Sequence, residues 1–344
     1  MLYCPDLGCG WGDAVDILFK RGIYLPEIGL WMDSLRKQEC SLISHGHSDH
    51  TARHTHPILT SNTHLILAEY LQKSDPIILE YREPFETSEY KLTMYPAGHC
   101  LGSAQSLIES KRTGERILYT GDFKVKTNSV NEPLEHIPCD ILIMESTYGR
   151  PEYTFPPEEE VISYACETIK SWLKRGAKPI VRGWKLGKAQ EIIYKLLENK
   201  FDIRLEESIF QMTSKYIEAG IQFPGKIQLF DGNWQDGTVL VCPLGSWTKK
   251  HISALRAKRI MDLTGWANTS NYHWGGGADC SLQYSDHADF SELVAYAQQA
   301  NPRQIYTVNG FPELSTHLRE LGYPSVHLDD KGISDHSGFQ MKML

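Results

Sequence analysis

The chain has 344 residues, a net charge of −8 at neutral pH and eight cysteines, no two of which form a C-x-x-C pair. Its length exceeds the usual size of one compact domain, so the sequence predicts two. The cysteine spacing argues against a zinc ribbon and against a disulfide-rich secreted scaffold. No apolar run approaches the ~20 residues that span a bilayer, and a signal-peptide pattern is lacking, which favours a cytoplasmic protein.

Up to about residue 150, short apolar runs alternate with loops that contain glycine and proline, which predicts β-strands joined by turns. A short buried strand is predicted at Cys40–Ser44, and Thr63–Lys73 is one of the few stretches that favour a helix. Two further strands are predicted from alternating or apolar residues at Tyr90–Met94 and Ile117–Thr120.

The stretch His45–His50 follows the first of these strands and reads His-Gly-His-Ser-Asp-His. Its three imidazoles and one carboxylate cannot all point the same way from a helix or a strand, but a tight turn can direct them toward one centre. Both groups bind zinc well, and such sites lower the pKa of bound water to generate a nucleophile. The motif therefore predicts a metal site; the alternative is a chance cluster of ordinary histidines.

Two later residues also follow predicted strands, in loops of the kind that display functional side chains on a rigid scaffold. His99 lies in an Ala-Gly-His sequence, and Asp122 lies in Gly-Asp. Taken alone, a Gly-Asp pair is usually just a turn. In combination with the histidine-rich motif, the two positions are predicted to complete the metal site.

The second part of the chain predicts an α/β unit. Pro151–Pro157 indicates a proline-rich hinge, which an amphipathic helix follows over Glu158–Arg175 with acidic residues in its first turn. Lys178–Arg182 predicts a strand, and Gly187–Asn199 predicts a helix. After a glycine-rich stretch at 274–277, the sequence predicts a closing helix, strand and helix at Ser291–Ala300, Gln304–Val308 and Glu313–Leu321.

The order of the motifs His45–His50, Ala-Gly-His99 and Gly-Asp122 resembles the metallo-β-lactamase fold. The upstream sequence Leu-Trp-Met-Asp33 is similar to that family's first motif. The resemblance implies two divalent metal ions, with zinc as the expected metal, and an Asp33 that orients a ligand imidazole. It also implies the ligands: His45, His47 and His99 for one zinc, Asp49 and His50 for the second, and Asp122 as the bridge, with Asp49 and Asp122 counted as catalytic residues.

Two further motifs resemble the β-CASP nucleases, the branch of this fold that cuts nucleic acids. In the first, an apolar strand over 140–145 ends in Glu145 and is followed by Ser-Thr-Tyr-Gly. The second is Tyr284–Phe290, centred on His287. The resemblance implies that Glu145 and His287 are catalytic and face the metals, although Glu145 could instead cap a following helix. Three more residues are candidate contacts to the substrate phosphate: Ser146, Thr147 and Lys188.

The third signature separates DNA-cutting from RNA-cutting members. RNA-cutting members carry a histidine in a Val-His-Gly context, whereas this chain has Asn309 in Val-Asn-Gly. An asparagine at this position resembles the third signature of the DNA-processing group, which includes Artemis and its relatives. Lys185–Gln190 and Thr264–Ala267 further resemble ligase-associated DNA exonucleases. Without the imidazole, the second metal is expected to be weakly held and exchangeable with manganese or magnesium, and His287 is either the general acid or a metal ligand.

Together, the motifs predict a four-layer αββα metallo-β-lactamase domain formed by residues 1–150 and 278–344, with an inserted α/β β-CASP cap at 151–277. The predicted function is that of a 5′-to-3′ DNA exonuclease in DNA repair, associated with the nucleoid in a prokaryote, with a DNA ligase or other repair proteins as partners. An RNA-processing nuclease of the same fold is the alternative, and a non-catalytic scaffold subunit is a further one.

The net charge of −8 predicts that DNA binding is local, because affinity for DNA depends on neutralising phosphates. Basic residues cluster at Lys111–Arg112, at Lys124 and Lys126, and from Lys249 to Arg259 on a predicted helix. The last cluster is either a DNA contact or an ordinary solvated helix face.

Overall fold

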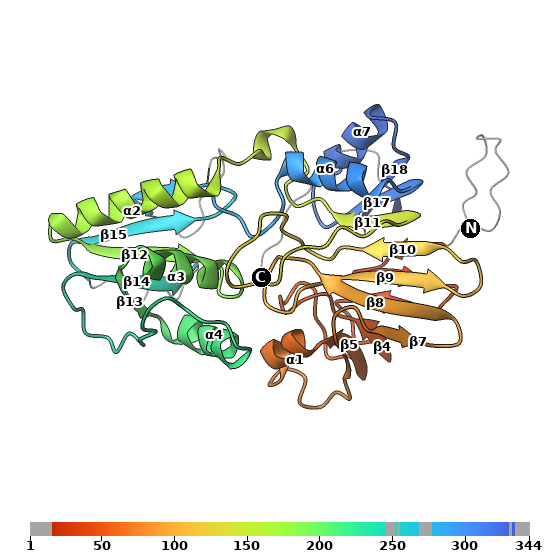
Figure 1. Cartoon of the computed structure of the whole chain (residues 1–344), viewed down its shortest axis with the longest axis horizontal. Helices are drawn as coiled ribbons and strands as arrows, with labels where there is room; N and C mark the ends of the chain where they lie inside the picture. The colour runs from red at the N-terminus through yellow and green to blue at the C-terminus, as the bar shows by residue number, and fades with distance from the viewer. Residues whose placement is uncertain (1–15, 245–251, 253–254, 268–276, 330–331, 334–344) are drawn as a thin grey trace.

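The computed structural model describes residues 16–244, 252, 255–267, 277–329 and 332–333. Three β-sheets organise this part of the chain, and Figure 1 shows two of them stacked at one end of the molecule and the third at the other end.

The first sheet has six strands in chain order, from β1 to β6. Its strands span Leu18–Phe19, Ile23–Leu25, Leu30–Met32, Cys40–Leu42, His56–Thr60 and Ile77–Leu79. Helix α1, Ser61–Leu67, follows β5, and the Thr60 side chain caps its first turn. The predicted helix at 63–73 is therefore too long. The chain turns after Leu67, and the Ser74 N–H bonds to the carbonyl of Leu71.

The second sheet has eight strands in the order β19-β18-β17-β11-β10-β9-β8-β7. The strands β7 to β10 pair antiparallel, whereas β10, β11, β17 and β18 pair in parallel. In chain order they span Pro84–Glu86, Tyr90–Pro96, Ala104–Ser110, Arg116–Tyr119, Ile141–Glu145, Gln304–Val308, Ser325–Asp329 and Gly332–Ile333. Helices α6, Phe290–Ala300, and α7, Glu313–Glu320, accompany the parallel half, as predicted.

Apolar side chains fill the space between these two sheets, because alternate residues of each strand point to the same face. Met32 and Ile58 of the first sheet share one buried cluster with Leu92 and Ile143 of the second. The opposite face of the second sheet packs against α6 and α7, where Leu293 joins another buried cluster. With α1 on the outer side of the first sheet, this αββα order of layers confirms the predicted fold class.

The third sheet consists of five parallel strands in the order β13-β14-β12-β15-β16. In chain order, β12 to β16 span Lys178–Gly183, Asp202–Leu205, Thr238–Pro243, Lys258–Leu263 and Cys280–Leu282. Three helices accompany it: α2, Glu158–Lys174; α3, Lys188–Glu198; and α4, Glu207–Glu218. The 3-10 helix η1, Pro151–Tyr153, precedes α2. The predicted strand and helices at 158–199 are confirmed to within one residue at each end. The domain boundaries at 150 and 277 stay a prediction.

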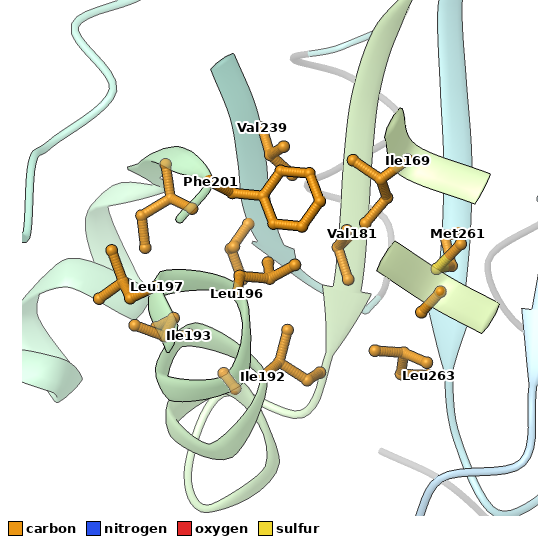
Figure 2. Close-up of a cluster of buried hydrophobic side chains, with 14 of the residues drawn as sticks. Ile169, Val181, Ile192, Ile193, Leu196, Leu197, Phe201, Val239, Met261 and Leu263 are labelled. Carbon is orange, nitrogen blue, oxygen red and sulfur yellow. The ribbon is translucent and has the colours of Figure 1, made fainter. Parts of the chain in front are cut away.

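The third sheet and its helices form a third unit, whose core lies between the sheet and helices α2 and α3. Ile169 of α2, Ile192 and Leu196 of α3, and Val181 of β12 converge in one cluster (Figure 2). The three acidic residues in the first turn of α2 suit the positive end of the helix dipole, while its apolar residues recur on one face.

The predicted helix through the basic residues 249–259 is wrong for its described end. Lys258 and Arg259 begin strand β15, and Arg256 lies in the turn before it. The following residues, 260–263, are buried in parallel pairing with β12, which a helix could not provide. Lys249 lies outside the described residues.

Arg182 of β12 and Asp262 of β15 form a buried ion pair between adjacent strands, with Arg182 Nε 2.6 Å from Asp262 Oδ1. Asp262→Ala should lower the free energy of unfolding by ~3–5 kcal/mol, since it leaves a buried guanidinium without its carboxylate. Glu198→Ala, which breaks the exposed pair with Lys195, should cost ~0.5 kcal/mol or less. Urea unfolding measures the free energy of unfolding of both variants. Equal losses of stability in the two variants would contradict the expectation.

Candidate metal centre

Six of the seven predicted metal ligands lie in loops at one edge of the first two sheets, Asp49 among them in the loop after β4; the seventh, His287, lies between β16 of the third sheet and α6. His45, His47 and His50 follow β4, His99 lies between β8 and β9, and Asp122 follows β10. Each loop leaves the end of a buried strand, so the rigid sheets fix the positions from which these side chains converge.

Three of the histidines present nitrogen atoms to one another. His47 Nδ1 lies 3.0 Å from His45 Nε2 and 3.0 Å from His99 Nε2, and Asp122 Oδ2 lies 3.6 Å from His45 Nε2. Nitrogens bonded to one tetrahedral zinc at ~2.0–2.1 Å lie roughly 3.3 Å apart, so the spacing and the donor set both suit this metal.

The surroundings keep these imidazoles neutral, which a metal ligand requires. Burial lowers the pKa of His45 well below 6.5 and also lowers the pKa of His47. For His99, burial and the neighbouring His287 lower the pKa to about 3. The imidazoles of His45, His47 and His99 are therefore unprotonated at neutral pH, and their nitrogens can bind a metal cation.

Asp33 holds several side chains of the site in place through hydrogen bonds to its carboxylate. Its carboxylate accepts hydrogen bonds from the Ser44 N–H at 2.7 Å, the Ser44 hydroxyl at 2.6 Å and the Tyr119 hydroxyl at 2.7 Å. It also lies 2.7 Å from His50 Nδ1, and the Ser44 hydroxyl lies 2.9 Å from His45 Nδ1. Asp33 has φ 47°, a conformation that few non-glycine residues adopt. Sequence reasoning found Asp33 but missed Ser44 and Tyr119.

Asp122 lies between two groups of ligands. Its Oδ2 atom is 3.2 Å from His50 Nε2 and 3.6 Å from His45 Nε2. Burial acts to lower the pKa of His50, but Asp122 and Asp33 outweigh burial and raise it well above 6.5. Asp49 is exposed, and among the described residues it belongs to none of the groups whose potential ligand atoms lie within 4.8 Å of one another.

Residues from the second half of the chain orient two of the candidate ligands. His47 Nε2 lies 3.2 Å from the carbonyl oxygen of Leu186, in the loop after β12. His99 Nδ1 lies 2.7 Å from the carbonyl oxygen of Asp286. An imidazole that donates one N–H to a carbonyl turns its other nitrogen toward a metal. Sequence reasoning missed both carbonyls, since any residue type supplies one.

Glu145 and His287 form a pair beside the cluster. His287 Nδ1 lies 3.0 Å and 3.1 Å from the two carboxylate oxygens of Glu145, which also accepts the Phe123 N–H at 2.8 Å. Burial acts to lower the pKa of His287, but Glu145 outweighs it and the pKa rises to about 9. The His287 ring lies 4.5 Å from that of His99. The alternative role of Glu145 as a helix cap is wrong, because turns follow β11 and no helix begins there.

The three candidate phosphate contacts have other partners in the structure. Lys188 is buried, with Nζ 2.8 Å from Asp286 Oδ1, so its ammonium neutralises that carboxylate instead of facing solvent. The Ser146 hydroxyl donates to a carbonyl of β17, and the Thr147 hydroxyl lies 3.5 Å from the carbonyl oxygen of Asn309. Only Thr147 is partly exposed, and Asn309 has φ 55°.

The predicted basic cluster at Lys124 and Lys126 is not an open positive surface. Lys124 is buried, with Nζ 2.7 Å from a Glu191 oxygen and 2.9 Å from a Glu158 oxygen. The Tyr284 hydroxyl donates to Glu191 at 3.0 Å. These contacts tie α2 and α3 to the loop after Asp122, so the third unit is joined to the metal centre by buried charges.

Comparisons with known proteins agree with this geometry. A family model described as "Zn-dependent metallo-hydrolase RNA specificity domain" matches residues 281–334. A protein named "Probable DNA ligase" from Opitutus terrae is 34% identical over 313 residues, covering 89% of this chain and 30% of that protein. "DNA cross-link repair 1A protein" from Mus musculus is 24% identical over 323 residues, covering 85% and 31%. "RNase J-like protein" from Methanocaldococcus jannaschii is 30% identical over 222 residues, covering 55% and 52%.

The chain spans less than a third of the length of the first two of these relatives. The names of the relatives include both DNA-processing and RNA-processing proteins. The matched model describes zinc-dependent hydrolases, in agreement with the imidazole and carboxylate groups that converge here. Within the described ranges, no helix is both long and apolar enough to cross a membrane.

Proposed function

Since the chain belongs to the β-CASP branch of the metallo-β-lactamase superfamily, we propose that it is a metal-dependent nuclease that hydrolyses DNA phosphodiester bonds. The observation that carries this proposal is the position of the Glu145–His287 pair. Potential ligand atoms of Asp122, Glu145 and His287 all lie within 4.8 Å of one another. An acid–histidine pair next to a metal centre can act on the oxygen that leaves phosphorus.

In this proposal two divalent ions, with zinc as the expected metal, bind the clustered side chains. When bound, they would polarise a phosphoryl oxygen and supply a nucleophile from water at neutral pH. One ion would be held by the three-histidine cluster, and the other by His50 with Asp49. Asp122 would serve both, since its carboxylate is near His45 and His50. The ion at the three-histidine cluster would also be bound by His47 and His99.

His287 is the proposed proton donor to the leaving oxygen. Glu145 holds its Nδ1 atom, which leaves Nε2 for the substrate. The carboxylate also favours the charged imidazolium, so the proton to be delivered is present at neutral pH. Because the Ser146 hydroxyl donates to a carbonyl of β17, we propose that Ser146 supports the site through this strand and does not contact the phosphate. Thr147 is the residue proposed to contact the phosphate directly.

Two observations support DNA over RNA as the substrate. The third signature carries Asn309 in place of histidine. Two similar proteins that align with most of the chain have names that concern DNA ligation and DNA cross-link repair. We therefore propose a 5′-to-3′ exonuclease that works in the cytoplasm in DNA repair, with a DNA ligase as a partner. RNA processing is the second candidate, because the matched family model and the RNase J-like relative both concern RNA.

Cleavage of matched DNA and RNA strands tests the choice of substrate. We expect a preference for DNA of at least tenfold in kcat/KM, ~1.4 kcal/mol, which a few contacts around the ribose 2′ position can supply. Both strands should carry the same sequence and be compared with and without a 5′-phosphate, which also tests the direction of cleavage. Equal or faster cleavage of RNA would overturn the DNA assignment and support the second candidate.

A further inference from the structure

Backbone carbonyls of two residues far along the chain orient two of the candidate zinc ligands. His47 Nε2 lies 3.2 Å from the carbonyl oxygen of Leu186, and His99 Nδ1 lies 2.7 Å from that of Asp286. A carbonyl can hold an imidazole in one orientation only if its own peptide is held in place. The orientation of both imidazoles therefore depends on the side chains that fix these two peptides.

The first turn of helix α3 contains one such side chain, Gln190, which is fully buried. Its Oε1 atom accepts the N–H of Gly187 at 2.9 Å, and its Nε2 atom donates to the carbonyl of Lys185 at 3.2 Å. Nε2 also donates to the Thr213 hydroxyl of α4 at 3.2 Å, which holds the amide itself. Because Gly187 and Lys185 flank Leu186 in the chain, these bonds fix the peptide that faces the metal centre.

The same turn of α3 contains Lys188, which fixes the second peptide. Its Nζ atom lies 2.8 Å from Asp286 Oδ1, and the two side chains are 1% and 2% exposed. A buried charge that loses its partner is costly, so the ion pair holds Asp286 in one position. Asp286 provides the carbonyl that orients His99, and it directly precedes His287, the proposed proton donor.

Gly187, the residue before α3, packs closely on the loop of His99 and on Asp286. A Cβ atom there would lie 3.2 Å from the carbonyl oxygen of His99, 3.1 Å from Cys100 Cβ and 3.4 Å from Asp286 Oδ2. Gly187 also has φ 83°, a conformation that favours glycine. A displacement of the first turn of α3 would therefore move the groups that orient the zinc ligands.

We propose that Lys188 and Gln190 are positioning residues that set the zinc affinity of the three-histidine cluster, each through a peptide carbonyl that orients one ligand. Both side chains belong to one helix turn of the third unit, so the contact of that unit with the metal centre and the binding of zinc are coupled. This inference rests on the metal-dependent part of the proposed function. It gives Lys188 a role other than the predicted phosphate contact.

The test measures the zinc affinity of metal-free protein by competition with a chromophoric chelator. Gln190→Met removes the amide at nearly unchanged volume. Lys188→Met is combined with Asp286→Asn, because the double variant leaves neither charge buried alone and keeps the net charge beside the metal unchanged. Loss of a group that supports a metal ligand typically weakens metal binding by about 10–100-fold, and we expect at least the lower end of this range, about tenfold, in both variants.

Two control variants remove comparable side chains of the third unit that support other segments. Glu206→Ala removes the side chain that caps the first turn of α4, where it accepts two backbone N–H groups. Lys215→Met removes an ammonium that donates to the carbonyls of Leu65 and Ile66 in α1. Both variants should keep the zinc affinity of wild type even if they unfold at lower urea concentrations, because lower stability does not change the affinity of protein that remains folded.

Circular dichroism and urea unfolding identify the variants that are folded under the conditions of the assay. If Gln190→Met is not folded, Thr213→Val takes its place, since it withdraws only the hydroxyl that holds the Gln190 amide. Wild-type zinc affinity in a folded variant overturns the proposal for the residue concerned, and an equal loss of affinity in the controls overturns it for both residues.

The outcome for the proposed function is separate, because the affinity measurement uses no nucleic acid. Wild-type protein that binds zinc but cuts neither DNA nor RNA would overturn the nuclease proposal and leave the role of Lys188 and Gln190 in place. Weaker zinc binding in both variants, with unchanged binding in both controls, is the result that we expect.

Discussion

Asp122→Ala is expected to abolish nuclease activity and to lower the amount of zinc that the purified protein retains. The Asp122 carboxylate lies 3.6 Å from His45 Nε2 and 3.2 Å from His50 Nε2, so it is positioned to serve both proposed ions. We expect kcat to fall by at least about 10³-fold, which is ~4 kcal/mol of transition-state stabilisation. Wild-type protein should carry close to two zincs, or one tight and one weak.

Metal analysis of the dialysed proteins measures the first effect, and cleavage of a labelled DNA strand measures the second. Asp75→Ala is a suitable control, because Asp75 is 87% exposed and its only side-chain ion-pair partner in the structure as described is His56. It should keep both zinc and activity. Full metal occupancy in Asp122→Ala would show that Asp122 does not bridge.

His287→Ala is expected to lower kcat by about 10²–10⁴-fold, the usual contribution of a general acid, while the zinc at His45, His47 and His99 stays in place. The reason is the geometry of the pair: Glu145 holds His287 Nδ1, and the three-histidine cluster forms without His287. Glu145→Gln should give a smaller loss, since the amide still accepts a hydrogen bond but no longer stabilises the imidazolium.

Zinc content and single-turnover cleavage of each variant distinguish the two roles that the sequence left open for His287. Retained zinc with slow cleavage supports the general acid, whereas loss of one zinc equivalent supports a metal ligand. Wild-type cleavage by His287→Ala would mean that the histidine is structural and would weaken the nuclease proposal. His317→Ala, which removes a partly exposed histidine of α7, should change neither quantity.

The amino-acid sequence was sufficient for features that depend on local chemistry and period. The histidine-rich motif at His45–His50 shows its donor set directly, and the later His99 and Asp122 follow recognisable strands. The predictions at α2, β12, α3 and β17 agree with the structure, because periods of 3.6 and 2 residues are set by the secondary structure itself. The predicted helix through Lys258 was wrong because pairing with β12 overrides the local pattern.

Only the tertiary structure decided how the site is supported and which charges are free. The carbonyls of Leu186 and Asp286 orient His47 and His99 from more than a hundred residues away in the chain. No sequence pattern marks a carbonyl oxygen as a hydrogen-bond partner, because every residue carries one. In the same way, Lys188 is a cationic residue in the sequence but a buried partner of Asp286 in the fold. Burial and pairing depend on which distant elements meet, and that is a property of the folded chain rather than of any segment.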